Sequence, residues 1–179
     1  MSALFRAALK AAVVGGLAVS GLAGCGSSGD RFAPACPRPS ILSDASNLNR
    51  YRGSGRDFLD TTLQGRVVSI NGSCRQDSKD FVAATVSVGI ELTRGPAAAG
   101  RETDVPFFVA VTEGDRVLDK QVYTIRAVFP ENTDRLRLSG DSVDLRLPVT
   151  ETLHADAYRV TVGFQLTPAE LEAARRGGR

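Results

Sequence analysis

The residues of this chain best suited to recognising a ligand are three arginines and a tyrosine close together in the sequence. The cluster consists of Arg50, Tyr51, Arg52 and Arg56. It surrounds Gly53-Ser54-Gly55, a run typical of a surface loop. An arginine guanidinium presents its N–H donors in a planar fork that matches carboxylate and phosphate groups. The cluster therefore predicts a binding loop for lipid headgroups, cell-wall peptides or an acidic partner, while a solvated loop is the alternative interpretation.

Side chains for catalysis or metal binding are scarce. His154 is the only histidine, and neither a Gly-x-Ser-x-Gly motif nor a suitable cysteine accompanies it. A structural zinc site needs three or four cysteine or histidine ligands, and no Gly-x-x-x-x-Gly-Lys phosphate loop is present. We therefore expect no catalytic residues, no metal and no enzyme activity. A small hydrolase that uses two carboxylates stays open as an alternative.

Two pairs of acidic residues raise the question of calcium. Glu113 and Asp115 flank Gly114, and Asp141 and Asp144 lie close together further on. Neither pair has the ligand spacing of a dedicated calcium loop. Acidic residues at such positions are typical of turns, and we interpret both pairs in this way.

The N-terminal residues have the pattern of an export signal. Arg6 and Lys10 precede an apolar run over residues 11–23, and small residues lead to Cys25. The run is shorter than the roughly 20 apolar residues that span a bilayer. Its ending, Leu22-Ala23-Gly24-Cys25, resembles the lipobox of bacterial lipoproteins.

The resemblance implies a lipid anchor. In that family residues 1–24 would be a cleaved signal peptide, and Cys25 would carry a diacylglycerol and an N-acyl chain. More than one acyl chain gives stable membrane attachment. The family's sorting rule favours the outer membrane, because Gly26 rather than an aspartate follows the cysteine. The expected location is therefore the bacterial cell envelope, facing the periplasm, with membrane lipid as one partner and no other cofactor.

Charge argues against nucleic acid as a partner. The chain has 22 basic and 20 acidic side chains, and Arg6 and Lys10 are the only charged residues of the expected signal peptide. The mature protein would therefore be near neutral, without the basic field that nucleic-acid binding needs. Residues 25–179 have the length of one domain, and 42% apolar residues is ordinary for a globular core.

The other two cysteines form an even pair in what would be an oxidising compartment. We therefore predict a disulfide between Cys36 and Cys74, which would fasten the N-terminal segment to the first strand region. Two buried free thiols are the alternative. Redox catalysis is not expected, because the chain has no Cys-x-x-Cys motif.

Composition divides the mature chain into three parts. Residues 25–40 contain a Gly/Ser run followed by prolines, and we interpret them as an acylated flexible tether. Residues 41–60 give no clear period, since helix-like apolar spacing near 41–48 is weakened by polar residues, and we expect an irregular segment. Residues 61–179 are expected to form a β-sandwich domain with a C-terminal helix.

Alternation of apolar and polar residues is the clearest structural signal. It runs over Val82–Leu92 and again over Tyr158–Leu166, which predicts long strands with one face on a core. Other short apolar runs bring the total to about seven strands; the expected ranges are Gln64–Ile70, Val82–Leu92, Phe107–Val111, Val117–Val128, Leu136–Leu138, Val143–Leu147 and Tyr158–Leu166. This count favours an all-β, antiparallel sandwich similar in architecture to immunoglobulin and fibronectin type III domains, although the chain has no tryptophan.

Turn signals predict how these strands connect. Asn71-Gly72 predicts a tight turn after the first strand. Loops at Thr112–Asp115 and Ser139–Asp141 predict two hairpins. At the C-terminus Thr167 and Glu170 have the spacing of a capping box around Pro168, so a helix is expected to begin there and to cover one end or edge of the sandwich.

The expected function follows from the anchor, the small disulfide-linked domain and the lack of catalytic residues. We expect a non-enzymatic envelope lipoprotein that serves as an accessory, assembly or structural subunit for an envelope protein partner. An exposed edge strand, such as one ending near Thr112, could bind that partner by strand addition. The alternative is a ligand-binding or inhibitor module that uses the arginine cluster.

Overall fold

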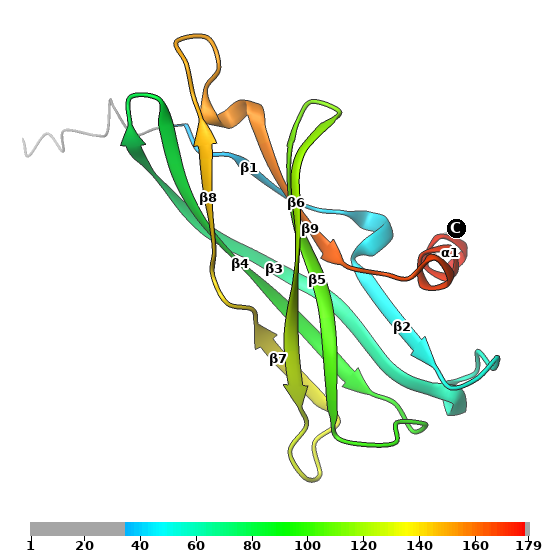
Figure 1. Ribbon diagram of the computed structural model, residues 1–179. Coiled ribbons are helices and arrows are strands. Elements are labelled where there is room, and N and C mark those ends of the chain that lie inside the picture. The colour runs from blue at the N-terminus through cyan, green and yellow to red at the C-terminus, as the bar shows by residue number, and fades with distance from the viewer. Residues whose placement is uncertain (1–34, 178–179) are drawn as a thin grey trace, which may run out of the picture. The chain divides into compact units, whose positions relative to one another are not determined.

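The computed structural model describes residues 35–177 of the chain (Figure 1). The expected signal peptide, Cys25 and most of the expected tether lie outside these residues. Within them the chain forms two β-sheets packed as a sandwich, with three short 3-10 turns and one C-terminal helix. The sandwich and the helix predicted from the sequence are confirmed.

The two sheets contain four and five strands. In the four-stranded sheet, called sheet A here, the order is β1 (Arg38–Ile41), β9 (Tyr158–Phe164), β5 (Glu102–Glu113) and β6 (Arg116–Val128). In sheet B the order is β2 (Asn47–Tyr51), β3 (Thr61–Ser78), β4 (Phe81–Arg94) and β7 (Arg135–Ser139), with β8 (Val143–Pro148) also paired to β4. Among these strands β1 and β9 are the one parallel pair.

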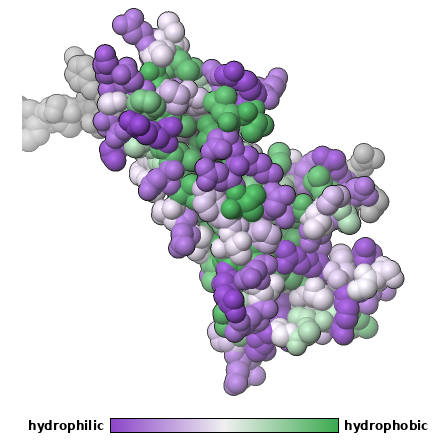
Figure 2. All heavy atoms as spheres, in the orientation of Figure 1, coloured by the Kyte–Doolittle hydropathy of each residue, from purple (hydrophilic) through white to green (hydrophobic). Residues whose placement is uncertain are grey.

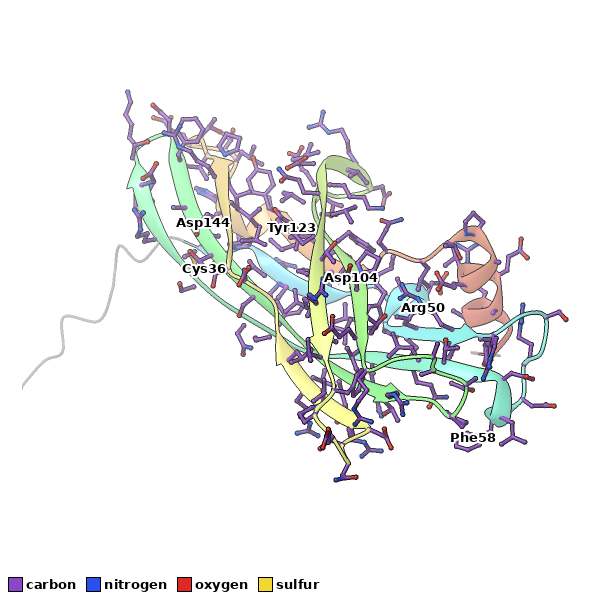
Figure 3. The ribbon with its side chains drawn as sticks, turned by 60° about the horizontal axis from the view of Figure 1, so that its bottom comes forward. Cys36, Arg50, Phe58, Asp104, Tyr123 and Asp144 are labelled. Atoms are coloured by element: carbon purple, nitrogen blue, oxygen red, sulfur yellow. A yellow bond between two sulfur atoms is a disulfide. The ribbon has the colours of Figure 1, made fainter. Side chains whose placement is uncertain are left out.

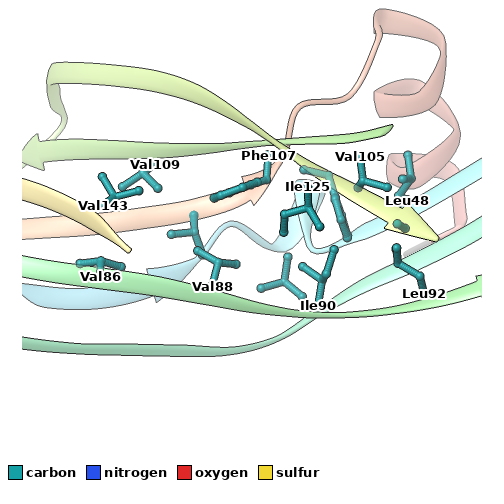
Figure 4. Packing of buried hydrophobic residues seen from close by; sticks show 14 of the residues in the cluster. Leu48, Val86, Val88, Ile90, Leu92, Val105, Phe107, Val109, Ile125 and Val143 are labelled. Atoms are coloured by element: carbon teal, nitrogen blue, oxygen red, sulfur yellow. The ribbon is translucent and has the colours of Figure 1, made fainter. Parts of the chain in front are cut away.

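The core lies between the sheets, where the alternating residues of the two long predicted strands meet. Every second residue of β4 from Val82 to Leu92 is buried, and the residues between them point outward. β9 contributes Val160, Val162 and Phe164 from the opposite sheet. Figure 4 shows the β4 side chains facing those of sheet A across this core. Burial of two facing apolar rows is what joins the sheets.

The prediction of about seven strands was wrong, because residues 35–177 contain nine. The two additional strands, β1 and β2, lie in the residues expected to be a tether and an irregular segment. β1 has four residues and includes Pro39, and its partner β9 follows more than 100 residues later. β2 has five residues, of which only Leu48 is fully buried. Strands this short, at sheet edges, leave no alternating pattern. The helix-like spacing near 41–48 corresponds to a 3-10 turn, η1 (Ser43–Ala45).

The expected turn at Asn71-Gly72 is also wrong. Both residues pair with β4 inside β3, which continues to Ser78 before the chain turns at Lys79 and Asp80. A side chain at Gly72 would place its Cβ atom 2.7 Å from the backbone oxygen of Thr85. The glycine therefore allows the two strands to approach closely. Close approach of another backbone is a common reason for a glycine within a strand, besides a turn or a bulge.

Of the two predicted hairpins, the first is confirmed. β5 and β6 form an antiparallel pair whose turn includes Gly114 at φ +57°. The second is wrong, because β7 and β8 do not pair with each other and instead follow one another along β4. The backbone N–H of Gly140, between them, donates to the Val88 carbonyl at 2.9 Å. This bond continues the β4 ladder across the connection.

The C-terminal helix α1 (Pro168–Gly177) begins as predicted. The Thr167 backbone N–H donates to Glu170 Oε2 at 2.7 Å, and the Glu170 backbone N–H donates to Thr167 Oγ1 at 3.3 Å. This capping box fixes the start of the helix. The helix packs against β2 and η1, and Arg175 forms a 2.9 Å salt bridge to Asp44 of η1. α1 therefore covers the β2 edge of the sandwich.

Candidate functional site

The structure brings three of the four predicted binding residues together. β2 ends at Tyr51, and the following loop includes Gly53 at φ +64° and the 3-10 turn η2 (Phe58–Asp60). A cavity of about 260 Å³ lies between this loop, β2 and α1. Its lining includes Asn49, Arg50, Tyr51, Arg56, Ala169 and Glu170. Arg52 is exposed and does not line the cavity. We call this depression the Tyr51 cavity.

Arg50 serves the fold within this cavity. Its Nε donates to Glu170 Oε1 at 3.1 Å, and its Nη1 donates to the Asp104 backbone oxygen at 3.0 Å. Figure 3 shows Arg50 and Asp104 next to each other. One guanidinium thus connects β2 of sheet B, β5 of sheet A and the helix. These two bonds, to a carboxylate and to a backbone oxygen of the other sheet, assign Arg50 to the fold.

Removal of this connection is expected to weaken the domain. Arg50→Ala removes the salt-bridge partner of the largely buried Glu170 carboxylate, which keeps only its hydrogen bond from the Thr167 N–H, and we expect the free energy of unfolding to fall by about 1–3 kcal/mol. Urea denaturation measures the change. Arg52→Ala removes the same charge from an exposed side chain and should change stability by no more than about 0.5 kcal/mol. Equal effects of the two substitutions would contradict the connecting role of Arg50.

Arg56 and Tyr51 form the part of the cavity that faces solvent. The Arg56 guanidinium carbon lies 5.2 Å from the centre of the Tyr51 ring, within the range of a cation–π contact. Arg56 Nη1 also donates to the Gly55 carbonyl at 2.6 Å. These contacts hold the guanidinium over the ring and leave its other N–H groups available. Arg56 is therefore the cation of this cavity best placed to meet an anion.

A second polar depression, which the sequence analysis missed, lies on the outer face of sheet B. It measures about 270 Å³ and is lined by outward-pointing residues of β2, β3, β4 and β7; they include Asn47, Asn49, Gln64, Arg66, Thr93 and Arg135. We call it the sheet B groove. Asn49 lines both this groove and the Tyr51 cavity. Only the strand register places these residues together, so no local motif could have indicated them.

The predicted disulfide between Cys36 and Cys74 is present. It joins the segment just before β1 to β3, and a third cavity, of about 250 Å³, lies beside it. This cavity is mostly apolar, and its lining includes Pro37, Pro39 and Val160. It is a space between the sheets where β1 crosses from the disulfide to β9. No charged side chain lines it, and Ser73 and Thr85 are its hydroxyl-bearing residues.

The histidine and the acidic pairs considered from the sequence lie apart from the two polar depressions. His154 is exposed and precedes the 3-10 turn η3 (Ala155–Ala157). Glu113 pairs with Arg116, and Asp144 accepts a 2.8 Å hydrogen bond from Thr85. Residues 35–177 contain no group of three or more histidine, cysteine, aspartate or glutamate side chains that could hold a metal ion.

Strand β6 is a third candidate, as an interaction edge. The expected edge near Thr112 was wrong, because Thr112 lies in β5, which pairs with strands on both sides. β6 is the outermost strand of sheet A and has 13 residues. Its exposed aliphatic side chains are Val117, Leu118, Val122 and Val128. On the face of the molecule seen in Figure 2, hydrophobic areas are small and separated by hydrophilic ones.

The fold thus belongs to the broad class of β-sandwiches, and it presents two polar depressions and an open strand edge as candidate binding surfaces. Comparison with known proteins adds no family: no family model, no curated protein and no solved structure matches this chain. Within residues 35–177, no helix combines the length and the apolar character that crossing a membrane would take.

Proposed function

We propose that this protein is a non-enzymatic, lipid-anchored subunit of the bacterial cell envelope that binds a partner protein by strand addition to β6. The lipobox-like ending at Cys25 supports the anchor and suggests the outer membrane, facing the periplasm. The observation that carries the proposal is the open edge of β6, which has 13 residues and no neighbouring strand on its outer side among the described residues.

The other sheet edges are less suitable for strand addition. β1 has four residues and contains Pro39, which lacks an N–H donor. β2 has α1 packed beside it. β7 and β8 have five and six residues and share one edge of β4. β6 alone combines length with exposed aliphatic side chains. Natural proteins usually protect such an edge, so an open one indicates a partner.

The outer face of β6 also suggests the character of the partner strand. Lys120, which lies over the Phe108 ring, and Arg126, which pairs with Glu102 of β5, share this face with aliphatic side chains such as Val122. A strand that alternates acidic and apolar residues would complement this pattern.

A charge introduced at β6 is expected to prevent partner binding. Val122 is 52% exposed, so Val122→Asp should leave the fold intact while placing a charge in the proposed interface. We expect the partner that is cross-linked to the wild-type protein in native membranes to be lost from this variant, as measured by mass spectrometry of the detergent-purified protein. Leu59→Asp provides the control, because Leu59 is 75% exposed and lies in η2, outside β6.

The control variant should retain the partner. Loss of the partner from both variants, or purification of wild-type protein with nothing attached, would contradict the proposal. Circular dichroism of both variants checks that the β-sandwich is retained.

A ligand-binding or inhibitor module is the second candidate function, and the Tyr51 cavity supports it. The cavity is concave and has a fixed cation at Arg56, which a subunit with a purely structural role does not need. For either function we propose a likeness to immunoglobulin and fibronectin type III domains in architecture alone: two packed sheets serve as a rigid scaffold for a binding surface.

A further inference from the structure

We propose that the sheet B groove binds an acidic oligosaccharide, with Arg66 and Arg135 recognising its carboxylates. This site deepens the second candidate function by naming the class of ligand. It is independent of β6, which belongs to the other sheet.

The groove is built by strand register. Asn47 of β2 lies opposite Arg66 of β3, Arg66 lies opposite Glu91 of β4, and Glu91 lies opposite Arg137 of β7. A second row runs parallel to the first, from Asn49 to Arg135. Neighbouring strands are about 4.8 Å apart, so each row extends about 14 Å across the sheet. Rigid strands therefore hold all these side chains, with no loop involved.

The groove has a local excess of positive charge. Glu91 is its one carboxylate, and it accepts a 2.9 Å hydrogen bond from Arg137 Nε. That hydrogen bond, together with the charges of Arg137, Arg135 and Arg66, lowers the pKa of Glu91 in spite of partial burial. Arg66 and Arg135 are exposed, and neither forms a salt bridge with another described residue. Two guanidinium groups are therefore available to an anion.

The other side chains of the groove distinguish a glycan from other anions. Asn47, Asn49 and Gln64 each carry a carbonyl acceptor and an NH₂ donor, the combination that pairs with sugar hydroxyl groups. None of the lining residues is aliphatic or aromatic, which disfavours an acyl chain or an apolar peptide. A densely charged polyphosphate would need more cations than two free arginines. Hydroxyl groups with occasional carboxylates match what the groove presents.

The adjoining Tyr51 cavity gives the site additional length. It shares Asn49 with the groove and presents the Arg56 guanidinium over the Tyr51 ring. A chain of several sugar units could therefore occupy the groove and continue toward α1, with a further carboxylate at Arg56.

Binding can be tested with the full-length protein in detergent. We expect oligogalacturonate, a glycan of uronic acids, to bind in isothermal titration calorimetry, and neutral maltohexaose to bind at least about tenfold more weakly because it lacks the carboxylates. Arg66→Gln and Arg135→Gln should each weaken oligogalacturonate binding by about tenfold, the loss of one charge-assisted hydrogen bond. Arg75→Gln is the matched control, since Arg75 also lies in β3 but pairs with Ala83, outside the groove.

The other outcomes overturn the proposal. Equal binding of the acidic and neutral glycans would refute carboxylate recognition, and stronger binding of poly-aspartate would indicate an acidic protein instead. If oligogalacturonate does not bind, or if Arg66→Gln and Arg75→Gln lose affinity for it equally, the sheet B groove is not the binding site. Val122→Asp should bind oligogalacturonate normally, so the groove and the β6 proposal can fail separately.

Discussion

Replacing Cys36 and Cys74 together by serine is expected to lower the free energy of unfolding by about 4 kcal/mol. The disulfide joins residues 38 positions apart, and closing a loop of this length removes that much conformational entropy from the unfolded chain in the chain-entropy model. The native state is also destabilised by loss of the disulfide, because β1 has only four residues and is paired with β9 alone in sheet A. Without the covalent link, we expect β1 to detach more often.

Urea denaturation of the oxidised protein and of the Cys36→Ser/Cys74→Ser variant measures this loss. Cys25→Ser serves as the control, because it removes the third cysteine, together with the proposed lipid anchor, and leaves the disulfide pair of the folded domain intact. Hydrogen exchange in β1 and β9 should increase in the double variant and stay unchanged in the control. Equal midpoints for the wild type and the double variant would contradict the stabilising role.

Phe164→Ala is expected to destabilise the domain by about 3–5 kcal/mol. Phe164 is the last residue of β9; it lies opposite Phe107 and is buried in the main core cluster. The space around it is already filled, because a Cβ atom at Gly65 would lie 3.0 Å from the tip of its ring. Loss of the ring leaves a cavity between the two sheets that the rigid strands cannot close.

Phe58→Ala is the matched control, because Phe58 is 72% exposed and undergoes the same chemical change. It should alter the free energy of unfolding by no more than about 0.5 kcal/mol. Both free energies of unfolding are measured by chemical denaturation, and the two transitions are fitted with one shared m-value, the slope of the free energy against denaturant concentration. A loss below 1 kcal/mol for Phe164→Ala would show that the sheets adjust to the cavity.

The parts of the fold that were predictable are those with a local pattern. Alternation over Val82–Leu92 and Tyr158–Leu166 identified the strands that carry much of the core. The spacing of Thr167 and Glu170 identified the start of α1. The disulfide followed from an even pair of cysteines in an expected oxidising compartment. For the strands and the helix start a few neighbouring residues contain the physical reason, whereas the disulfide followed from the number of cysteines.

The parts that failed depend on residues distant in sequence. β1 is a strand because β9, far along the chain, supplies its partner. Gly72 lies within a strand because the Thr85 backbone approaches it closely, which the local sequence cannot indicate. β7 and β8 looked like a hairpin because the local sequence does not show that both strands pair with β4 rather than with each other.

The candidate site was predictable only in part for the same reason. Arg50, Tyr51 and Arg56 are neighbours in sequence and do share a cavity. Their roles differ, however, because Glu170 and Asp104 engage Arg50 from distant parts of the chain. The arginines of the sheet B groove, Arg66 and Arg135, come together only through the order β3-β4-β7.

The position of the disulfide determines how the domain responds to mechanical tension. Any force transmitted along the chain from residues before Cys36 meets the covalent bond to Cys74 before it reaches the hydrogen bonds between β1 and β9. The load therefore enters the molecule within β3, whose ladder with β4 extends from Leu63 to Ser78. When a surface-tethered copy is pulled from its N-terminal side, the force needed to unfold it should therefore depend on the long β3–β4 pair. We expect β1 to separate from β9 first only when the Cys36–Cys74 disulfide is reduced.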